Sequence, residues 1–75
     1  MIKYECRTYY SNYGTGNYFE DEDARVTKAI TDEKAKAFAN FFKEIGCKHY
    51  ETSKAHFYEK TIDASHYEQY IIYKQ

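Results

Sequence analysis

Apolar and polar residues alternate along the first ten positions, which predicts a β-strand. The even-numbered residues share one face, namely Ile2, Tyr4, Cys6, Thr8 and Tyr10. A period of two with β-branched and aromatic side chains is typical of a strand whose first face is buried. We expect this strand to end in the turn-forming residues 11–17, where glycines permit positive φ angles.

The apolar spacing changes to three and four after residue 31, which predicts one amphipathic helix over residues 32–45. Its apolar stripe consists of Ala35, Phe38, Ala39, Phe42 and Ile45. Thr31 can cap the first turn, and Gly46 suits the left-handed residue that often ends a helix. We expect this stripe to anchor the fold.

Strand patterns fill most of the remaining chain. They cover residues 25–30, 47–52, 55–62 and about 67–73, with a turn at 63–65. The chain of 75 residues is predicted to form a single domain, 1–75, with one modest core. Its expected class is α+β, a small and mostly antiparallel sheet of three to five strands with the helix packed on one face.

One helix covers only one face of such a sheet, yet the last two strands are apolar on both sides. Tyr67, Ile71 and Tyr73 alternate with Tyr70 and Ile72. The preceding strand alternates in the same way, with Phe57 on one face and Tyr58 and Ile62 on the other. Exposed tyrosines are enriched in binding hot spots. We therefore expect a partner-binding surface built from those that point outward, drawn from Tyr58, Tyr67, Tyr70 and Tyr73. The alternative is that these tyrosines only cover the surface of a small domain and bind no partner.

The acidic run Glu20, Asp21, Glu22 and Asp23 is the sharpest local charge in the chain. Such a run can imitate nucleic-acid phosphates and speed docking on a basic groove, so we include it in the expected partner-binding surface. The alternative is a solvated loop. A calcium loop does not fit, because Arg25 occupies the next ligand position and the required glycine is missing.

A phosphate-binding loop at Gly14-Thr15-Gly16 also fits poorly. The third glycine of that motif is absent and four carboxylates follow closely. We therefore expect no phosphate site there.

Net charge and hydropathy indicate where the protein is located and which kinds of partner it attracts. The net charge of −1 gives no global attraction to nucleic acid or to a membrane surface. No apolar run approaches the roughly 20 residues of a membrane span, and the first ten residues lack the apolar core of a secretory signal. We expect a cytoplasmic protein in which Cys6 and Cys47 are free thiols, with a Cys6–Cys47 bridge as the alternative.

Four residues could suggest a metal site or a nucleophile with its base, namely Cys47, His49, His56 and His66. Zinc needs three or four converging ligands, and His56 has the opposite strand parity to His49 unless a bulge or hairpin intervenes. Cys47 and His49 are two apart on one strand, so their side chains are roughly parallel, and no third group orients the histidine. We expect no metal, no cofactor and no catalysis.

Direct nucleic-acid binding is the first alternative to protein binding. Tyrosines on an open sheet can stack on bases when basic residues follow the backbone, and the candidates for that role are Lys48, Lys54, Lys60 and Lys74. Arginine is scarce and the net charge is negative, so this alternative ranks below protein binding. The second alternative is a structural homodimer in which the open face pairs with itself.

Four features together carry a resemblance at the level of a protein class. The chain is short, rich in Lys and Tyr and free of Pro, it has the acidic cluster 20–23, and its expected strands surround one helix. In these respects it resembles the small anti-defence inhibitors that phages encode, including anti-CRISPR proteins. The resemblance implies a stoichiometric inhibitor that acts in the cytoplasm of the host cell. Its partner would be a larger host protein, often one that handles nucleic acid.

Overall fold

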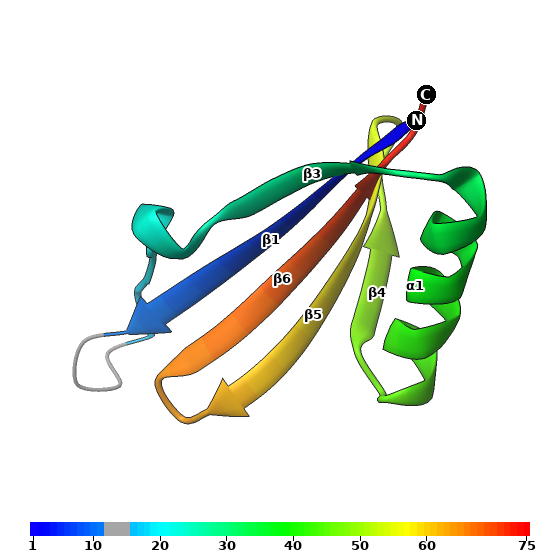
Figure 1. Ribbon diagram of the computed structural model, residues 1–75. Helices are drawn as coiled ribbons and strands as arrows, with labels where there is room; N and C mark the ends of the chain where they lie inside the picture. Colours follow the sequence, from blue (N-terminus) through cyan, green and yellow to red (C-terminus); the bar gives the residue numbers. More distant parts are fainter. Residues whose placement is uncertain (12–15) are drawn as a thin grey trace.

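A computed structural model describes residues 1–11 and 16–75 and shows one sheet with one helix beside it (Figure 1). The predicted turn at 11–17 therefore lies partly outside the described residues. Along the chain the elements are β1 (Ile2–Ser11), β2 (Tyr18–Glu20), the 3₁₀ turn η2 (Glu22–Ala24), β3 (Val26–Ile30), α1 (Asp32–Glu44), β4 (Lys48–Glu51), β5 (Ala55–Asp63) and β6 (His66–Tyr73).

All of the strand pairs are antiparallel, in the order β2-β1-β6-β5-β4. Strand β3 pairs with the first half of β1, on Ile2–Cys6, and β2 pairs with its last residues, Tyr9–Ser11. Strand β6 pairs with the other side of β1. Strands β2 and β3 therefore share one edge of the sheet. The α+β class is confirmed, but the sheet has six strands where three to five were expected, since the three-residue β2 adds one.

Helix α1 connects the β3 edge of the sheet to the β4 edge. Its start is capped as predicted, with the Thr31 Oγ1 accepting a hydrogen bond from the Lys34 backbone N–H at 3.1 Å. Gly46 follows the helix with a φ of 79°, a conformation that favours glycine. The predicted apolar stripe is wrong at Ile45, which is exposed. Ile45 is the C-cap residue, so the helical spacing no longer directs its side chain toward the sheet.

The face of the sheet that packs against α1, termed the helix side, carries the main core. Tyr4, Ile30, Tyr58 and Ile72 from the strands meet Phe42 from the helix. The Phe42 ring lies 5.2 Å from the Tyr58 ring and stacks on the Tyr70 ring at 4.4 Å. The predicted alternation along the last two strands is confirmed at Tyr58, Tyr70 and Ile72, which contribute to this core, but not at Ile62, which is exposed where the β5–β6 register shifts.

The other face of the sheet, termed the open face, is covered by no helix of residues 1–11 and 16–75 and still buries side chains. Ile71 is fully buried with 0% exposure, and Glu5 and Gln69 are buried close to it. Aromatic rings provide the cover, since the Tyr9 and Tyr67 rings stack at 4.8 Å and the Tyr50 and Phe57 rings stack at 4.9 Å. The open face is thus a second, smaller core that its own side chains cover.

Within residues 1–11 and 16–75, no helix has the length and apolar character needed to span a membrane.

Candidate partner-binding surface

The four tyrosines expected to bind a partner divide between the two faces of the sheet. Tyr58 is only 2% exposed and sits in the helix-side core, and Tyr70 is stacked against Phe42 on the same side. Tyr58 therefore leaves the candidate surface, whereas Tyr70 is half-buried with one face of its ring covered by Phe42. The reason is strand parity, since residues 58 and 70 pair directly across β5 and β6 under the helix.

Tyr67 and Tyr73 do lie on the open face, where both are half-buried. The Tyr73 hydroxyl donates to the Glu5 Oε2 at 3.4 Å, and the Lys3 Nζ lies 4.8 Å from the centre of the Tyr73 ring. Tyr67 is stacked on Tyr9. These contacts show that both rings serve the fold by covering the open-face core.

Polar groups beneath those rings form a connected network. The Gln69 amide nitrogen donates to the Tyr50 hydroxyl at 2.9 Å and to the Glu59 Oε2 at 3.3 Å, while the Gln69 Oε1 accepts from the Tyr9 hydroxyl at 3.3 Å. Burial, with a further contribution from Glu59, raises the pKa of Tyr50. The network satisfies the buried amide, which would otherwise be costly to desolvate.

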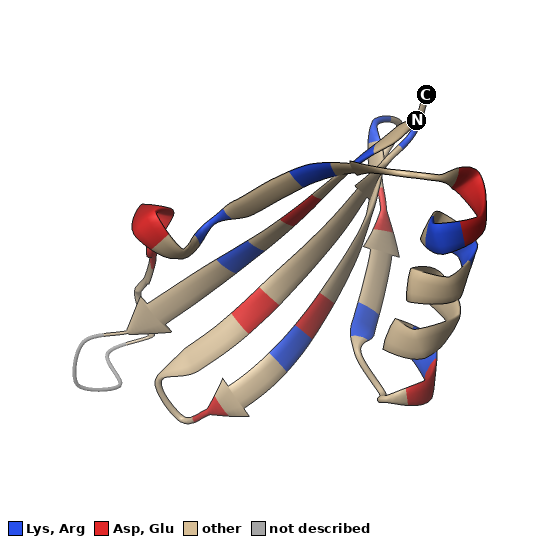
Figure 2. Cartoon of the chain, viewed as in Figure 1, with Lys and Arg blue, Asp and Glu red and all other residues tan. Residues whose placement is uncertain are grey.

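The acidic run lies at a corner of the sheet, where β2 ends and η2 begins (Figure 2). Glu20 is bound by Arg25, whose Nε and Nη2 donate to its two carboxylate oxygens at 2.7 and 2.5 Å. These hydrogen bonds hold the pKa of Glu20 below its ordinary value. Asp21 precedes η2, and Glu22 and Asp23 form its first turn. The three residues from Asp21 to Asp23 are exposed, so they carry the free negative charge of the run.

Strand β2 places exposed aromatic rings beside these carboxylates. Phe19 pairs with Tyr10 on the helix side and is 52% exposed, while Tyr18 pairs with Ser11 on the open face and is 41% exposed. Tyr10 itself is exposed, with its ring 6.2 Å from that of Phe19. A strand of three residues therefore presents an apolar ring on each of its two faces.

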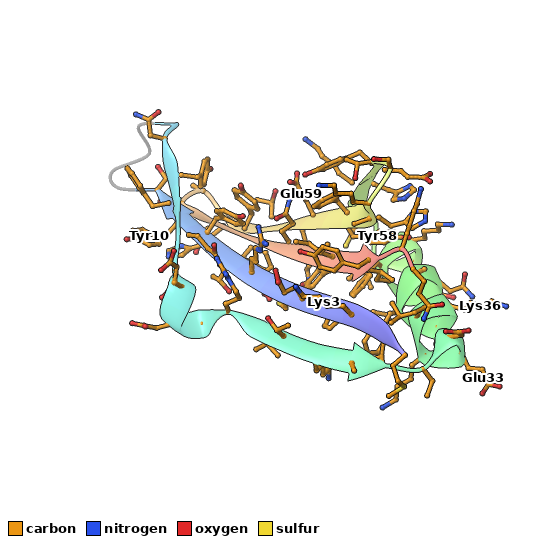
Figure 3. All side chains as sticks on the ribbon, turned by 90° about the horizontal axis from the view of Figure 1, so that it is seen from above. Lys3, Tyr10, Glu33, Lys36, Tyr58 and Glu59 are labelled. Carbon is orange, nitrogen blue, oxygen red and sulfur yellow. The ribbon has the colours of Figure 1, made fainter. Side chains whose placement is uncertain are left out.

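We term this region the acidic-aromatic corner and define it by Tyr10, Tyr18, Phe19, Asp21, Glu22 and Asp23. Figure 3 shows that Tyr10 lies at the opposite end of the molecule from Glu33 and Lys36 of α1, so the helix does not cover this end of the sheet. Sequence reasoning missed Tyr10, Tyr18 and Phe19. The available signal was the sequence Tyr-Phe directly before four carboxylates, which is too short to stand out as a strand.

A hollow of about 460 Å³ extends the corner onto the open face. Tyr18 and Tyr67 line it, with their rings in edge contact at 4.9 Å, and Lys48 and Glu59 border the other side. The hollow forms because β4 begins only opposite Glu59, which leaves the rest of β5 as a free edge on that side.

The cysteine and histidines do not converge as a metal site. A hairpin does intervene between His49 and His56, as the parity argument allowed: the β4–β5 hairpin puts both rings on the helix side, with the His49 Nε2 3.3 Å from the His56 Nδ1. His66 lies apart at the β5–β6 turn, 2.9 Å from the Asp63 carboxylate. No group of three or more His, Cys, Asp or Glu that could hold a metal ion occurs in the part of the chain that the structure describes.

Both cysteines are free thiols, and their surroundings disfavour the thiolate. Burial raises the pKa of Cys6 to about 11, with further contributions from Glu68. Burial also raises the pKa of Cys47, and the nearby Lys60 only partly opposes this. A raised thiol pKa lowers the fraction of reactive thiolate at neutral pH. The geometry thus gives no support to Cys47 as a nucleophile activated by His49.

The lysines proposed to follow a nucleic-acid backbone lie toward opposite ends of β5. Lys60 lies toward one end of the strand, and the Lys54 carbonyl accepts a hydrogen bond from the Lys74 backbone N–H at the other. Six residues of strand separate Lys54 from Lys60, or about 20 Å. The Lys74 ammonium is also ion-paired with Glu51. Lys48 and Lys60 line the hollow beside Tyr18 and Tyr67, whereas Lys54 and Lys74 lie at the far end of β5.

No protein-family model, curated protein or solved structure matches this chain significantly. The geometry of its own surface therefore carries the functional argument.

Proposed function

We propose that this protein is a non-enzymatic binding module that docks on a larger protein through the acidic-aromatic corner. The observation that carries the proposal is the exposure of Tyr18 and Phe19 on the two faces of β2, directly before the exposed carboxylates of Asp21–Asp23. Large apolar rings gathered at one exposed site favour association, because association removes their surface from water.

The two kinds of side chain contribute differently to binding. Aromatic residues near the centre of an interface supply most of the binding energy, and truncating one such residue to alanine costs about 2 kcal/mol or more. Charges at the rim mainly speed the encounter and set its salt dependence. We therefore assign affinity to Phe19 and Tyr18, and steering to Asp21, Glu22 and Asp23.

The charge of the corner suggests which surface the partner presents. Three carboxylates on an exposed turn complement a basic groove, and basic grooves are typical of proteins that bind nucleic-acid phosphates. By occupying such a groove the protein would block nucleic acid from it. This is the action expected of a phage-type inhibitor of a host nucleic-acid-handling or defence protein, and we propose that role.

The test uses the full chain and its partner, isolated from nuclease-treated lysate. In the variant Asp21→Asn/Glu22→Gln/Asp23→Asn we expect slower association and a weaker salt dependence, with little change in the dissociation rate. The control is Glu33→Gln/Glu44→Gln, which removes two exposed carboxylates from the two ends of α1 and should leave association nearly unchanged. Equal effects of the two variants would show that the corner does not steer binding.

A further inference from the structure

A second hollow lies between α1 and the helix side of β4, β5 and β6. It is a groove of about 530 Å³, and no residue of the acidic-aromatic corner lines it. Ala35 and Ala39 line it from the helix, and Tyr58 and Ile72 lie beneath, almost fully covered at 2% and 6% exposure. Its volume lies within the usual range of small-molecule sites, about 300–1,000 Å³.

The rim of this groove is basic. Lys36 and Lys43 line it from α1, two helical turns apart, or about 10 Å along the axis. Lys74 lines the opposite side but is ion-paired with Glu51. Among residues 1–11 and 16–75, neither Lys36 nor Lys43 has an ion-pair partner within 4.0 Å. The only acidic side chain among the lining residues of the described chain is that of Asp32, so the lining is net positive.

One wall of the groove is a stack of aromatic rings. His49 lies 4.7 Å from Tyr58, with the ring planes 19° apart, and 5.5 Å from His56, with the planes 16° apart. Cross-strand pairing of β4 with β5 fixes these rings in place. Flat apolar groups pack well against such rings, and imidazole N–H groups can donate to an anion.

We propose that this groove binds a small amphipathic anion, a phosphate or carboxylate group carried on a flat apolar body. The apolar body lies between Ala39 and the rings of His49 and His56, above the covered side chains of Tyr58 and Ile72. The anionic group meets Lys36 and Lys43 at the rim, where charge-assisted hydrogen bonds are stronger than neutral ones. The inference is independent of the proposed protein binding, because the two surfaces share no residue.

The test is a titration of the isotopically labelled protein followed by the NMR shifts of its backbone amides. The probe is 1-naphthyl phosphate, with 1-naphthol and inorganic phosphate as its two halves. We expect saturable shifts along α1, β4 and the start of β5 with the complete probe, and much weaker effects with either half. If 1-naphthol binds as tightly as 1-naphthyl phosphate, the anionic group does not contribute to binding and the proposal is wrong. If inorganic phosphate binds as tightly, the apolar groove does not contribute and the proposal is also wrong. Repeating the titration with 1-naphthoate distinguishes a carboxylate from a phosphate ligand.

Two variants test the position of the ligand. Lys36→Gln/Lys43→Gln should weaken binding of 1-naphthyl phosphate roughly tenfold or more, because two charged contacts are lost. Lys34→Gln/Lys60→Gln removes the same charge outside the groove and should change the affinity less than about twofold. Ala39→Leu fills the groove and should abolish binding while the amide spectrum stays folded. Unchanged binding in Lys36→Gln/Lys43→Gln or in a folded Ala39→Leu protein would overturn the proposal.

Discussion

The two faces of the sheet bury side chains in different ways. On the helix side, Phe42 of α1 packs on Tyr58 and Tyr70, as in a two-layer domain. On the open face the described residues form no second layer, and stacked tyrosines with a polar network cover Ile71. The comparison shows that a tyrosine-rich face without a helix is not automatically a binding surface, because here its rings already serve as the cover.

The helix-side core should give the largest effect on stability. Phe42→Ala removes a ring that touches aromatic partners from α1, β5 and β6, and we expect a loss of about 3–5 kcal/mol in the free energy of unfolding. Urea unfolding followed by circular dichroism measures this loss. Phe41→Ala is the matched control, because Phe41 is 54% exposed on the same helix and should cost under about 1 kcal/mol. Similar costs for the two variants would contradict the assigned core.

The open-face core should give the next largest effect. Ile71→Ala should cost about 2–5 kcal/mol in the free energy of unfolding, because the isoleucine is fully buried although no helix covers it. Its neighbour Ile72 lies on the helix side, and Ile72→Ala should cost a similar amount. If Ile71→Ala costs only a small fraction of the Ile72→Ala loss, the open face is not a core and its tyrosines are free for binding.

The polar network should contribute less than either apolar core. Gln69→Leu removes one hydrogen-bond partner from the Tyr9 hydroxyl and one from the Tyr50 hydroxyl. We expect a loss of about 1–2 kcal/mol in the free energy of unfolding. The control is Gln75→Leu, which removes one exposed hydrogen bond to the Met1 carbonyl and should cost under about 0.5 kcal/mol. A Gln69→Leu protein as stable as the parent chain would show that the network does not hold the tyrosine cover in place.

The smallest expected effect is a change in the pH dependence of stability at high pH. Burial, with the nearby Glu68 and Cys6, raises the pKa of Tyr70 from 10.0 to about 12. Because the pKa is raised in the folded state, the stabilisation is complete below pH 10 and is lost as the pH rises toward 12. As the pH rises from about 8 to 11, the urea midpoint of unfolding should fall less steeply in Tyr70→Phe than in the parent protein. An unchanged slope would place Tyr70 outside the helix-side core.

The sequence predicted the helix and most strands well, because each depends on local periodicity. The alternation in β1, β5 and β6 and the three-four spacing of α1 persist in the structure, except at Ile62 and Ile45, which are exposed. Which face each strand turns to the helix depends on pairing between distant segments, so Tyr58 and Tyr70 were placed in the candidate surface and proved to be covered, Tyr58 almost fully and Tyr70 on one face of its ring. The short β2 was missed because three residues are too few to show a period.

The acidic run illustrates the same limit at the candidate site. Its four carboxylates were predicted as one charged unit, but Arg25 folds back through η2 and neutralises Glu20. The neighbouring rings of Tyr10 and Phe19 come together only through the pairing of β1 with β2. Local sequence thus indicated the charge of the corner, whereas tertiary pairing determines which carboxylates and rings are available to a partner.

The most direct test of the proposed binding surface compares two equally exposed phenylalanines. Tagged parent protein, Phe19→Ala and Phe41→Ala are each used to capture partners from nuclease-treated host lysate at moderate salt. The proposed function predicts one discrete protein that the parent chain and Phe41→Ala retain and that Phe19→Ala loses. Equal capture by all three proteins, or recovery only of nucleic acid that nuclease removes, would contradict binding through the acidic-aromatic corner.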